Sequence, residues 1–486
     1  MTILANASHL PAHTQSPVLC VDLDGSLLAT DMLWESVLLA VKSRPSLLLI
    51  FPFWLLRGKA YLKRKIAERV KVNAAALPYR SDVLSFLVRE KKAGRKIVLT
   101  TASDMRLVQP IAQHIGVFDD VIASDGELNL KGTVKQKILE DRYGSKQFDY
   151  LGDSAADLAV WESANAALLV EPSKGTLKRA MRVATVERVF HSKVSRLLAV
   201  VKALRCNQWS KNLLIFVPLL TSHEIFELGL ILKALTAFVA MSFCASSIYI
   251  INDFLDVEAD RQHPKKKFRP VAAGTLSIPT GAGLAAVMCL GGLVLGWQML
   301  PLRFTGLLLV YLTLTVSYSI LLKRKMVADV ITLALLYTLR ILIGGAAVGV
   351  AISAWLLAFS MFLFLSLAFV KRYGEIGVIH RRSDEEVPGR AYIADDKAWM
   401  SNMGGTSGYL GILVFALYIN SNEVAALYRH PEVLWFACPP LLYWINRTWL
   451  LASRGKIDDD PLVFAATDRV SYAVALLVAI AIVAAL

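Results

Sequence analysis

Two carboxylates at the end of a short apolar segment are the first residues that could do chemistry. Asp22 and Asp24 end the apolar segment 17–23, and Gly25 follows them. Residues at i and i+2 of a strand point to the same side, and glycine favours a turn. One carboxylate could attack a phosphorus atom while the other protonates the leaving oxygen. Because turns are rich in Asp and Gly in any case, a plain turn remains the alternative.

Three more polar clusters follow strand-like or helix-opening segments in the same half of the chain. Strands that alternate with helices predict a parallel sheet, and sites collect beyond the carboxyl ends of its strands. We therefore expect all the clusters at one edge of the sheet. They are Thr100 and Thr101 after segment 96–99, Lys135 after Gly132, and Asp153 and Asp157 after segment 148–151.

This ordered set resembles the haloacid dehalogenase-like (HAD) superfamily of aspartate-nucleophile phosphatases over residues 17–183. The resemblance implies that Asp22 is the nucleophile and Asp24 the general acid and base. It also implies that a threonine binds the phosphoryl oxygens and that a lysine balances charge. Thr101 is favoured over Thr100, and Lys135 over its rival Lys131. A Mg²⁺ site is implied at Asp22, Asp24, Asp153 and Asp157, and a catalytically inactive regulatory domain is the alternative.

An apolar insertion separates the first two clusters. Residues 45–56 are mostly apolar, include Pro52 and are too short to span a bilayer. A cationic segment with Arg57, Lys59 and Lys63 follows. The pattern fits a helix at the membrane interface and a buried cap helix equally well. In either case we expect the phosphatase cleft to meet a lipid-borne substrate here.

The second half of the chain contains an acidic string that predicts a metal-diphosphate site. Asn252, Asp253, Asp256 and Asp260 follow an apolar stretch. On one helix the three aspartates would fall within about 60° of one another. Like charges on one face repel unless cations bind between them. Mg²⁺ bridging to a diphosphate is the favoured solution, with Lys265, Lys266 and Arg269 neutralising phosphate oxygens. A solvated loop is the alternative.

Apolar stretches after about residue 211 predict a multi-pass membrane domain. Alternate loops are basic, which predicts that they and the first domain are cytoplasmic. This topology accounts for most of the net charge of +14, so we expect no nucleic acid as partner. Five scattered cysteines predict neither disulfides nor a zinc site. The nine expected spans are near 211–222, 229–251, 279–299, 303–322, 327–349, 354–370, 405–421, 433–451 and 469–486.

A second polar set lies within these apolar stretches. Asp329, Tyr337 and Arg340 fall on one expected helix, and Lys323 ends the helix before it. Ionisable groups inside a membrane need a partner or a ligand. The set could therefore line a cavity or form a plain ion pair.

The membrane part resembles the UbiA superfamily of intramembrane prenyltransferases over about residues 200–486. The resemblance rests on the acidic string, which runs from Asn252 to Pro270 with the spacing NDxxDxxxDxxHPxKxxRP. Most of that family has a second acidic motif for a second magnesium, but here the corresponding region has only Asp329. The segments 208–212, 337–345 and 371–375 and the late acidic loop 455–469 resemble the decaprenyl-phosphate phosphoribosyltransferase branch instead.

That resemblance implies a transfer from phosphoribosyl pyrophosphate (PRPP) to a polyprenyl phosphate. Asn252, Asp253, Asp256 and Asp260 would hold Mg²⁺ on the diphosphate. The other implied contacts are Lys323, Arg340, Lys371 and Arg372 for the phosphates, and Tyr373 and Glu375 for the ribose end.

The expected architecture is an α/β HAD-like domain with a small helical cap, fused to an all-α bundle of about nine transmembrane helices in a bacterial inner membrane. Prenyl transfer from a prenyl diphosphate to an aromatic or other small acceptor is one alternative. A lipid-binding scaffold with only the HAD domain active is another, and a homo-oligomer is left open. The expected divisions are 1–16 flexible, 17–183 phosphatase-like, 184–206 linker and 207–486 transferase.

Overall fold

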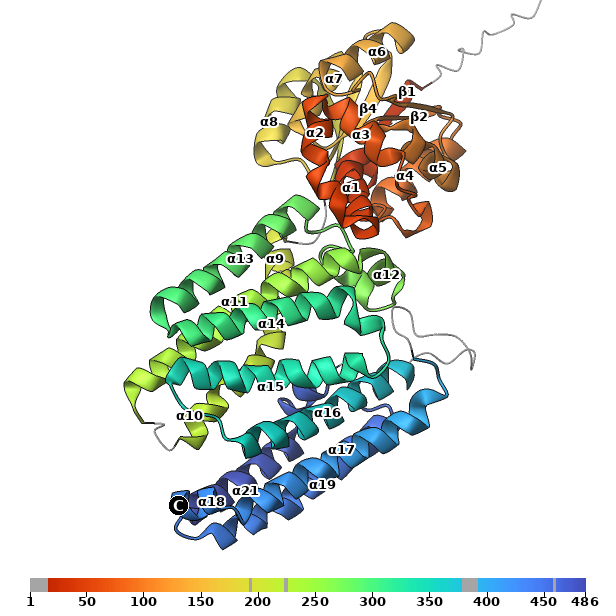
Figure 1. The fold of residues 1–486 in the computed structure, drawn as a ribbon. Helices are drawn as coiled ribbons and strands as arrows, with labels where there is room; N and C mark the ends of the chain where they lie inside the picture. The colour runs from red at the N-terminus through yellow and green to blue at the C-terminus, as the bar shows by residue number, and fades with distance from the viewer. Residues whose placement is uncertain (1–15, 192–194, 223–225, 378–391, 458–459) are drawn as a thin grey trace, which may run out of the picture. The chain divides into compact units, whose positions relative to one another are not determined.

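The computed structural model describes residues 16–191, 195–222, 226–377, 392–457 and 460–486 (Figure 1). The predicted flexible segment therefore lies outside the described residues, except for residue 16. Contacts divide the chain into two units. The sheet unit contains residues 1–203 and 253–281, and the helical unit contains residues 204–252 and 282–486.

The sheet unit is built on one parallel sheet of six strands in the order β3-β2-β1-β4-β5-β6. Apolar side chains of β1 point alternately to two cores. Leu19 and Val21 pack in one core and Cys20 in the other, so the strand is apolar throughout its length. The strands are β1 Val18–Asp22, β2 Ile97–Asp104, β3 Asp120–Ser124, β4 Phe148–Gly152, β5 Ala166–Val170 and β6 Thr185–Phe190.

Helices cover both faces of this sheet (Figure 1). Helices α4 and α5 contribute to the core that contains Leu19, and α6, α7 and α8 contribute to the core that contains Cys20. Strand β6 lies within the segment predicted to be a linker. The helices are α4 Ser81–Lys92, α5 Met105–Ile115, α6 Thr133–Tyr143, α7 Leu158–Ser163 and α8 Lys174–Val183. Helix α9 Arg196–Leu204 follows β6 in the chain, and its described residues contribute to neither core.

A small helical cap follows β1, as predicted. Its own small core joins Ala40, Leu47 and Ile66. The cap consists of α1 Met32–Ser43, the 3₁₀ turn η2 Pro45–Leu49, α2 Phe51–Leu56, α3 Lys59–Ala67 and the 3₁₀ turn η3 Ala74–Ala76.

Six helices are long and apolar enough to cross a membrane in the described part of the chain. Helix α15 is the most buried of them, and it packs against α14 and α16, while α16 also packs against α17 (Figure 1). These six are α11 Leu228–Leu255, α13 Ile278–Met299, α14 Leu302–Ile320, α15 Ala328–Val348, α16 Ala354–Gly377 and α17 Asp396–Ile419.

The predicted count of nine spans is not confirmed. Segment 211–222 forms a 3₁₀ stretch, η5 Cys206–Phe216, and the short α10 Val217–Thr221. Segment 433–451 is divided between the 3₁₀ turn η8 Pro431–Ala437 and α19 Cys438–Ser453, because Pro439 and Pro440 favour a new helix start there. The remaining helices are α12 Val257–Gln262, α18 Asn422–Leu427, α20 Pro461–Ala465 and α21 Arg469–Ala485, with 3₁₀ turns η6 Lys266–Phe268 and η7 Leu322–Arg324.

Candidate functional site

The turn after β1 places Asp22 and Asp24 at the carboxyl edge of the sheet. Gly25 has φ +76°, a conformation that favours glycine. A Cβ atom on Gly25 would come within 2.8 Å of Cγ of Asp153. Glycine therefore allows the Asp153 carboxylate, which follows β4, to lie directly against this turn.

Lys135 binds the predicted nucleophile. Its Nζ donates to Oδ1 of Asp22 at 2.6 Å and to the Tyr150 hydroxyl at 2.8 Å, and all three side chains are buried. Burial raises the pKa of Asp22 to about 7, although Lys135 opposes this rise. Burial disfavours the charged lysine, but Asp22 and Asp157 together hold the pKa of Lys135 above its ordinary value. The lysine thus keeps a cation beside the carboxylate of Asp22.

Asp24 lies among hydroxyl groups. Thr101 donates to its Oδ2 at 3.3 Å and Ser103 at 2.7 Å, while the backbone N–H of Met32 donates to Oδ1 at 2.7 Å. Thr100 instead donates to the carbonyl of Val21, at 3.4 Å. Thr101 therefore contacts Asp24 whereas Thr100 does not, and the binding of phosphoryl oxygens by Thr101 stays a prediction.

Lys135 and Lys131, the two candidates for the charge-balancing lysine, also differ in their contacts. Lys135 contacts Asp22, whereas Lys131 is exposed.

Asp153 and Asp157 lie on the turn after β4 but differ in their surroundings. Burial, together with Asp22 and Asp157, raises the pKa of Asp153 to about 8. Both oxygens of Asp157 accept hydrogen bonds, Oδ1 from Tyr150 at 3.0 Å and Oδ2 from Ser154 N–H and Oγ at 3.0 Å each. The charges of Asp22 and Asp24 also raise the pKa of Asp153, so these three carboxylates lie near one another, although no group of three acids within the described residues is arranged to hold a metal ion. Hard oxygen donors with excess negative charge fit Mg²⁺.

Lys63 is a site residue that the sequence reasoning missed. It lies on cap helix α3, and its Nζ donates to the carbonyl of Ala102 at 2.6 Å and to Oδ1 of Asn129 at 3.3 Å. Burial lowers the pKa of Lys63, and Asp24 and Asp31 oppose this. The cationic run that contains it was interpreted as part of either a membrane-interface helix or a buried cap helix, and Lys63 was given no role in the site. Its chemistry therefore becomes visible only once the cap is folded over the strand ends.

The acidic string does not continue one helix, contrary to the sequence-based expectation. Helix α11 ends at Leu255, and Asp256 adopts φ −102°, ψ 7° before α12 begins at Val257. The three aspartates thus do not share a single helical face.

Arg269 nevertheless brings two of the aspartates together. It donates to Asp260 at 2.6 Å and to Asp253 at 3.4 Å, and both aspartates are buried. Burial raises the pKa of Asp260, although Arg269 opposes this. Oδ1 of Asn252, on the preceding position of α11, is buried and accepts no hydrogen bond within the described residues. Amide and carboxylate oxygens of this kind fit a Mg²⁺ ligand set.

Other predicted residues of the acidic string lie around this pair. Asp256 is half-buried, and Lys265 is exposed with its backbone N–H donating to Nδ1 of His263 at 3.2 Å. Within the described residues, no group of three or more His, Cys, Asp or Glu is arranged to hold a metal.

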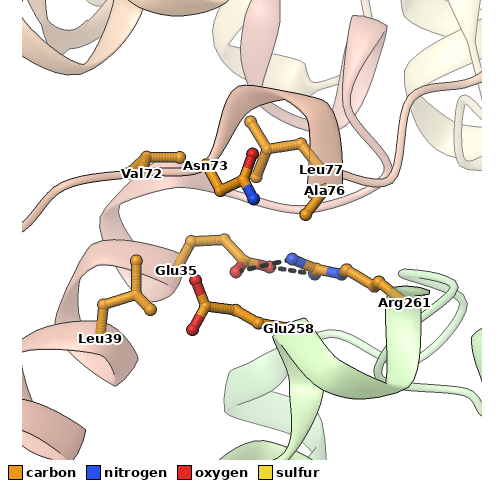
Figure 2. A pocket seen from close by; sticks show the side chains of 8 residues that line it. All are labelled: Glu35, Leu39, Val72, Asn73, Ala76, Leu77, Glu258 and Arg261. Atoms are coloured by element: carbon orange, nitrogen blue, oxygen red, sulfur yellow. Dashed lines mark hydrogen bonds and ion pairs between the residues drawn. The ribbon is translucent and has the colours of Figure 1, made fainter. Parts of the chain in front are cut away.

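Figure 2 shows the contact between this string and the cap within the sheet unit. Arg261 donates to the two oxygens of Glu35 at 2.6 and 3.2 Å, and its Nε donates to the carbonyl of Ala272 at 3.0 Å. Thr30 also donates to Glu35, at 2.9 Å. The sequence offered no signal for this pairing, since the two residues lie 226 positions apart.

Asp329 forms an interhelical ion pair in the helical unit. Nε of Arg372 lies 2.5 Å from Oδ2 of Asp329, and both side chains are buried. Arg372 also donates to Glu375 at 2.6 Å and to the Tyr318 hydroxyl at 2.5 Å. Of the two predicted readings of Asp329, the geometry supports the ion pair.

The remaining predicted cations occupy a second polar cluster of the helical unit. Arg340 donates to Asn212 and to the Tyr311 hydroxyl, both at 3.0 Å, and lies over the Tyr337 ring with its Cζ 5.4 Å from the centroid.

Asp460 accepts from two lysines, Lys211 at 2.5 Å and Lys371 at 3.3 Å. The sequence-based analysis named no role for Lys211, Asn212 or Asp460, although segment 208–212 had been noted. Lys323 is half-buried on η7, and Tyr373 packs edge-on against Trp449 with centroids 5.9 Å apart.

Residues 214–464 match the family model described as the UbiA prenyltransferase family. The chain belongs to the UbiA prenyltransferase family. A Sinorhizobium fredii protein described as uncharacterized protein y4nM is 37% identical over 474 residues, covering 97% of this UbiA chain and 91% of that protein.

Two further likenesses concern parts of this UbiA-family chain. A Corynebacterium glutamicum protein named decaprenyl-phosphate phosphoribosyltransferase is 38% identical over 192 residues, covering 38% of this chain and 57% of that protein. A crystal structure of phosphoserine phosphatase in apo form is 15% identical and covers 38% of this chain and 98% of that chain, with a TM-score of 0.28.

Proposed function

We propose that this multi-pass UbiA-family enzyme moves a 5-phosphoribosyl group from PRPP to a polyprenyl phosphate, and that its phosphatase-like part removes the 5-phosphate from the product. The enzyme works in a bacterial inner membrane with the sheet unit in the cytoplasm. Both sites use Mg²⁺. The likeness to the protein named decaprenyl-phosphate phosphoribosyltransferase supports this choice of donor and acceptor.

The arrangement of Asp253, Asp260 and Arg269 is the observation that carries the transferase half. Helix α11 ends before Asp256 and α12 begins after it, and Arg269 in the following loop contacts both Asp253 and Asp260. Together with the amide oxygen of Asn252, these carboxylates supply the hard oxygen ligands for Mg²⁺ on a diphosphate. Arg269 adds a guanidinium that can bind phosphate oxygens.

The single acidic residue of the second motif supports PRPP as the donor over a prenyl diphosphate. Asp329 is engaged by Arg372 and by the Tyr392 hydroxyl at 3.2 Å, so it is occupied in holding helices together. Most UbiA-type prenyl transfer, by the family resemblance, uses a second acidic motif for a second magnesium. The experiment below must distinguish transfer from PRPP from prenyl transfer to a small acceptor.

A cation excess in the helical unit suits two phosphorylated substrates. Lys211, Lys371 and Arg340 are accompanied by one carboxylate, Asp460. Phosphate groups are the anions that this charge pattern would attract. We assign these cations to phosphate binding, and Tyr373 and Glu375 to the ribose end.

The transfer step needs positioning more than acid–base catalysis. An oxygen of the polyprenyl phosphate bonds to the anomeric carbon of PRPP, and the bond from that carbon to the diphosphate oxygen breaks. A phosphate monoester is already ionised at neutral pH, so no strong base is required. Bound Mg²⁺ would stabilise the charge of the departing diphosphate. The chain's own cations hold both reactants in line.

The phosphatase step follows from the geometry around Asp22. An oxygen of Asp22 bonds to the phosphorus, the ester P–O bond breaks, and Asp24 gives a proton to the leaving alcohol. Water then attacks the phosphorus, Asp24 takes its proton, the bond between phosphorus and the Asp22 oxygen breaks, and inorganic phosphate leaves. Lys135 balances the charge of Asp22, while Thr101 and Ser103 position Asp24. Because both oxygens of Asp157 are already hydrogen-bonded, we assign it to positioning the turn and not to holding the metal.

Purified protein with Mg²⁺, PRPP labelled in the ribose and polyprenyl phosphate tests both halves. Wild-type protein should form a labelled ribosyl lipid, and Asp22→Asn should form the same lipid at an unchanged rate but retain its 5-phosphate. Asp260→Asn should lose the transfer and still hydrolyse the phosphorylated lipid when it is supplied.

Two results would contradict the proposal in separable ways. A label that reaches lipid only from a prenyl diphosphate, and never from PRPP, would replace the transferase half with prenyl transfer. Equal release of inorganic phosphate from the phosphorylated lipid by wild type and Asp22→Asn would remove the phosphatase half and leave the transferase intact.

A further inference from the structure

The cap of the sheet unit carries an unusual concentration of exposed apolar side chains. We name Leu48, Leu49, Ile50, Phe53, Leu55 and Leu56 the cap patch. All six fall within nine consecutive residues of η2 and α2. Leu56 is 86% exposed, Leu49 77% and Phe53 67%. Single exposed apolar residues are ordinary, but a contiguous group marks an interaction surface.

The cap patch is held in place by the cap's own core. Leu47 is buried with Ala40 and Ile66, so η2 is anchored on its inner side. Phe51 and Trp54 are half-buried and pack together with ring centroids 5.8 Å apart. Arg69 lies over the Trp54 ring at 4.6 Å. The backbone of this segment is therefore fixed, and the six patch residues are presented outward.

Cations border the cap patch on both sides. Arg44 precedes it, and Arg57 and Lys59 follow it, and all three are exposed. An apolar surface with flanking cations suits the interface of an anionic bilayer, where apolar side chains enter the acyl boundary and cations meet lipid phosphates. The chain itself crosses a membrane, so the cap is tethered to a bilayer by covalent linkage.

We propose that the cap patch inserts into the lipid–water interface of the membrane that the chain spans. The cap patch is connected to the phosphatase-like site through helix α3. Two residues, Arg57 and Gly58, separate the end of α2 from the start of α3, and Lys63 of α3 donates to the carbonyl of Ala102 beside the proposed catalytic aspartates. Insertion therefore holds the mouth of the phosphatase site at the level of lipid headgroups, where a phosphate on a polyprenyl carrier would be found.

Photolabelling of the full-length chain tests this directly. The protein is reconstituted in nanodiscs of phosphatidylethanolamine and phosphatidylglycerol that contain a phospholipid with a diazirine on its acyl chain. After photolysis and digestion, mass spectrometry locates lipid adducts. Residues 48–56 should carry about ten times more adducts than the peptide with Met181, because burial of an apolar side chain in lipid is worth more than 1.4 kcal/mol.

Met181 on α8 is the matched control, because it is 65% exposed and lies outside the cap. Equal labelling of the two peptides would overturn the proposal. Crosslinks from residues 48–56 to a second copy of the chain, in place of lipid adducts, would also overturn it by naming a protein partner.

A variant series links insertion to function. Leu49→Asp, Phe53→Asp and Leu56→Asp in one protein should reduce labelling of residues 48–56 about tenfold. Hydrolysis of a phosphorylated lipid in the same nanodiscs should fall in parallel, while hydrolysis of soluble p-nitrophenyl phosphate stays unchanged. Met181→Asp should alter neither rate.

Equal loss of both rates in the triple variant would contradict a membrane role for the cap patch. The labelling arm requires no phosphatase activity, so failure of the proposed reaction and failure of membrane insertion are distinguishable.

Discussion

The acidic cluster around Asp22 in the sheet unit and the buried carboxylates of the helical unit differ in how they are paired with cations. In the sheet unit, Asp22, Asp24 and Asp153 converge on one turn, and Lys135 contacts one of them, Asp22. In the helical unit, buried carboxylates are matched, since Asp329 pairs with Arg372 and Asp460 with two lysines. An excess of acids favours the binding of a cation, and the extra cations beside Asp460 favour the binding of an anion. The difference therefore supports the proposed metal site in the sheet unit and the proposed phosphate-binding site in the helical unit.

Replacing Lys135, which already pairs with Asp22, should have the largest effect on phosphatase activity. Lys135→Met should reduce phosphatase kcat by about 10³-fold, because it removes the charge that balances Asp22 in a buried site. Lys131→Met, at the exposed rival position, should change kcat less than about threefold by the same argument. Steady-state hydrolysis of p-nitrophenyl phosphate measures both. Similar losses in the two variants would contradict the assignment of Lys135.

Breaking a buried ion pair of the helical unit should lower the free energy of unfolding. Arg372→Met leaves Asp329 charged and buried, which should cost about 3–5 kcal/mol of unfolding free energy. The control is Arg447→Met, which breaks a more exposed pair with Asp468 and should cost about 1 kcal/mol or less. Thermal unfolding in detergent compares the two. If adding Asp329→Leu to Arg372→Met restores no stability, the pair does not act as a unit.

The effect of Mg²⁺ on the thermal stability of the sheet unit should depend on pH. The pKa of Asp153 is raised to about 8 and that of Asp22 to about 7. A raised carboxyl pKa means that the metal-free fold loses stability as pH rises from about 4 to about 8, because it must then hold charges that burial disfavours. Mg²⁺ should offset this loss above pH 8 and compete poorly with protons at about pH 6. We expect a larger Mg²⁺-induced rise in unfolding temperature at the higher pH, by about 5 °C.

Asp22→Asn is the control for that comparison, because it removes one of the titrating ligands. Its Mg²⁺-induced rise should be small at both pH values. An equal rise at both pH values in the wild type would contradict the interpretation of the acidic cluster as a metal site.

The smallest predicted effect separates two neighbouring hydroxyl groups. Thr101→Val should lower phosphatase kcat about tenfold, since it removes a hydrogen bond to Asp24 worth about 1.4 kcal/mol. Thr100→Val should leave kcat unchanged, because Thr100 donates to a backbone carbonyl. Kinetics on the soluble substrate measure both, and a larger loss in Thr100→Val would reverse the assignment.

The phosphatase-like site was largely predictable because its residues follow strand ends. A parallel sheet aligns the carboxyl ends of its strands, so Asp22, Thr101 and Asp153 had to meet once β1, β2 and β4 were recognised. Strands β3, β5 and β6 were not predicted. Their place in the sheet depends on long-range pairing that local sequence does not carry.

The helical unit was less predictable for two physical reasons. Hydropathy indicates which stretches are apolar but not which side chains face one another, so the pairing of Arg372 with Asp329 was only one of two readings. The break at Asp256 was invisible because periodicity assumes a continuous helix, and the three aspartates seemed to share one face. The prediction of a metal-diphosphate site at the acidic string therefore depends on the family resemblance and not on a shared helical face.

The sheet unit is discontinuous along the chain, and Arg261 and Gly274 belong to its second segment, residues 253–281. A Cβ atom on Gly274 would lie 2.6 Å from the carbonyl oxygen of Ala29, so the loop after α12 fits closely against the turn that follows the catalytic aspartates. A phosphatase excised at residue 203 would lack this loop and would leave Glu35 buried without its guanidinium partner. Cutting the chain at residue 203 would therefore remove part of the sheet unit itself, because residues 253–281 belong to that unit.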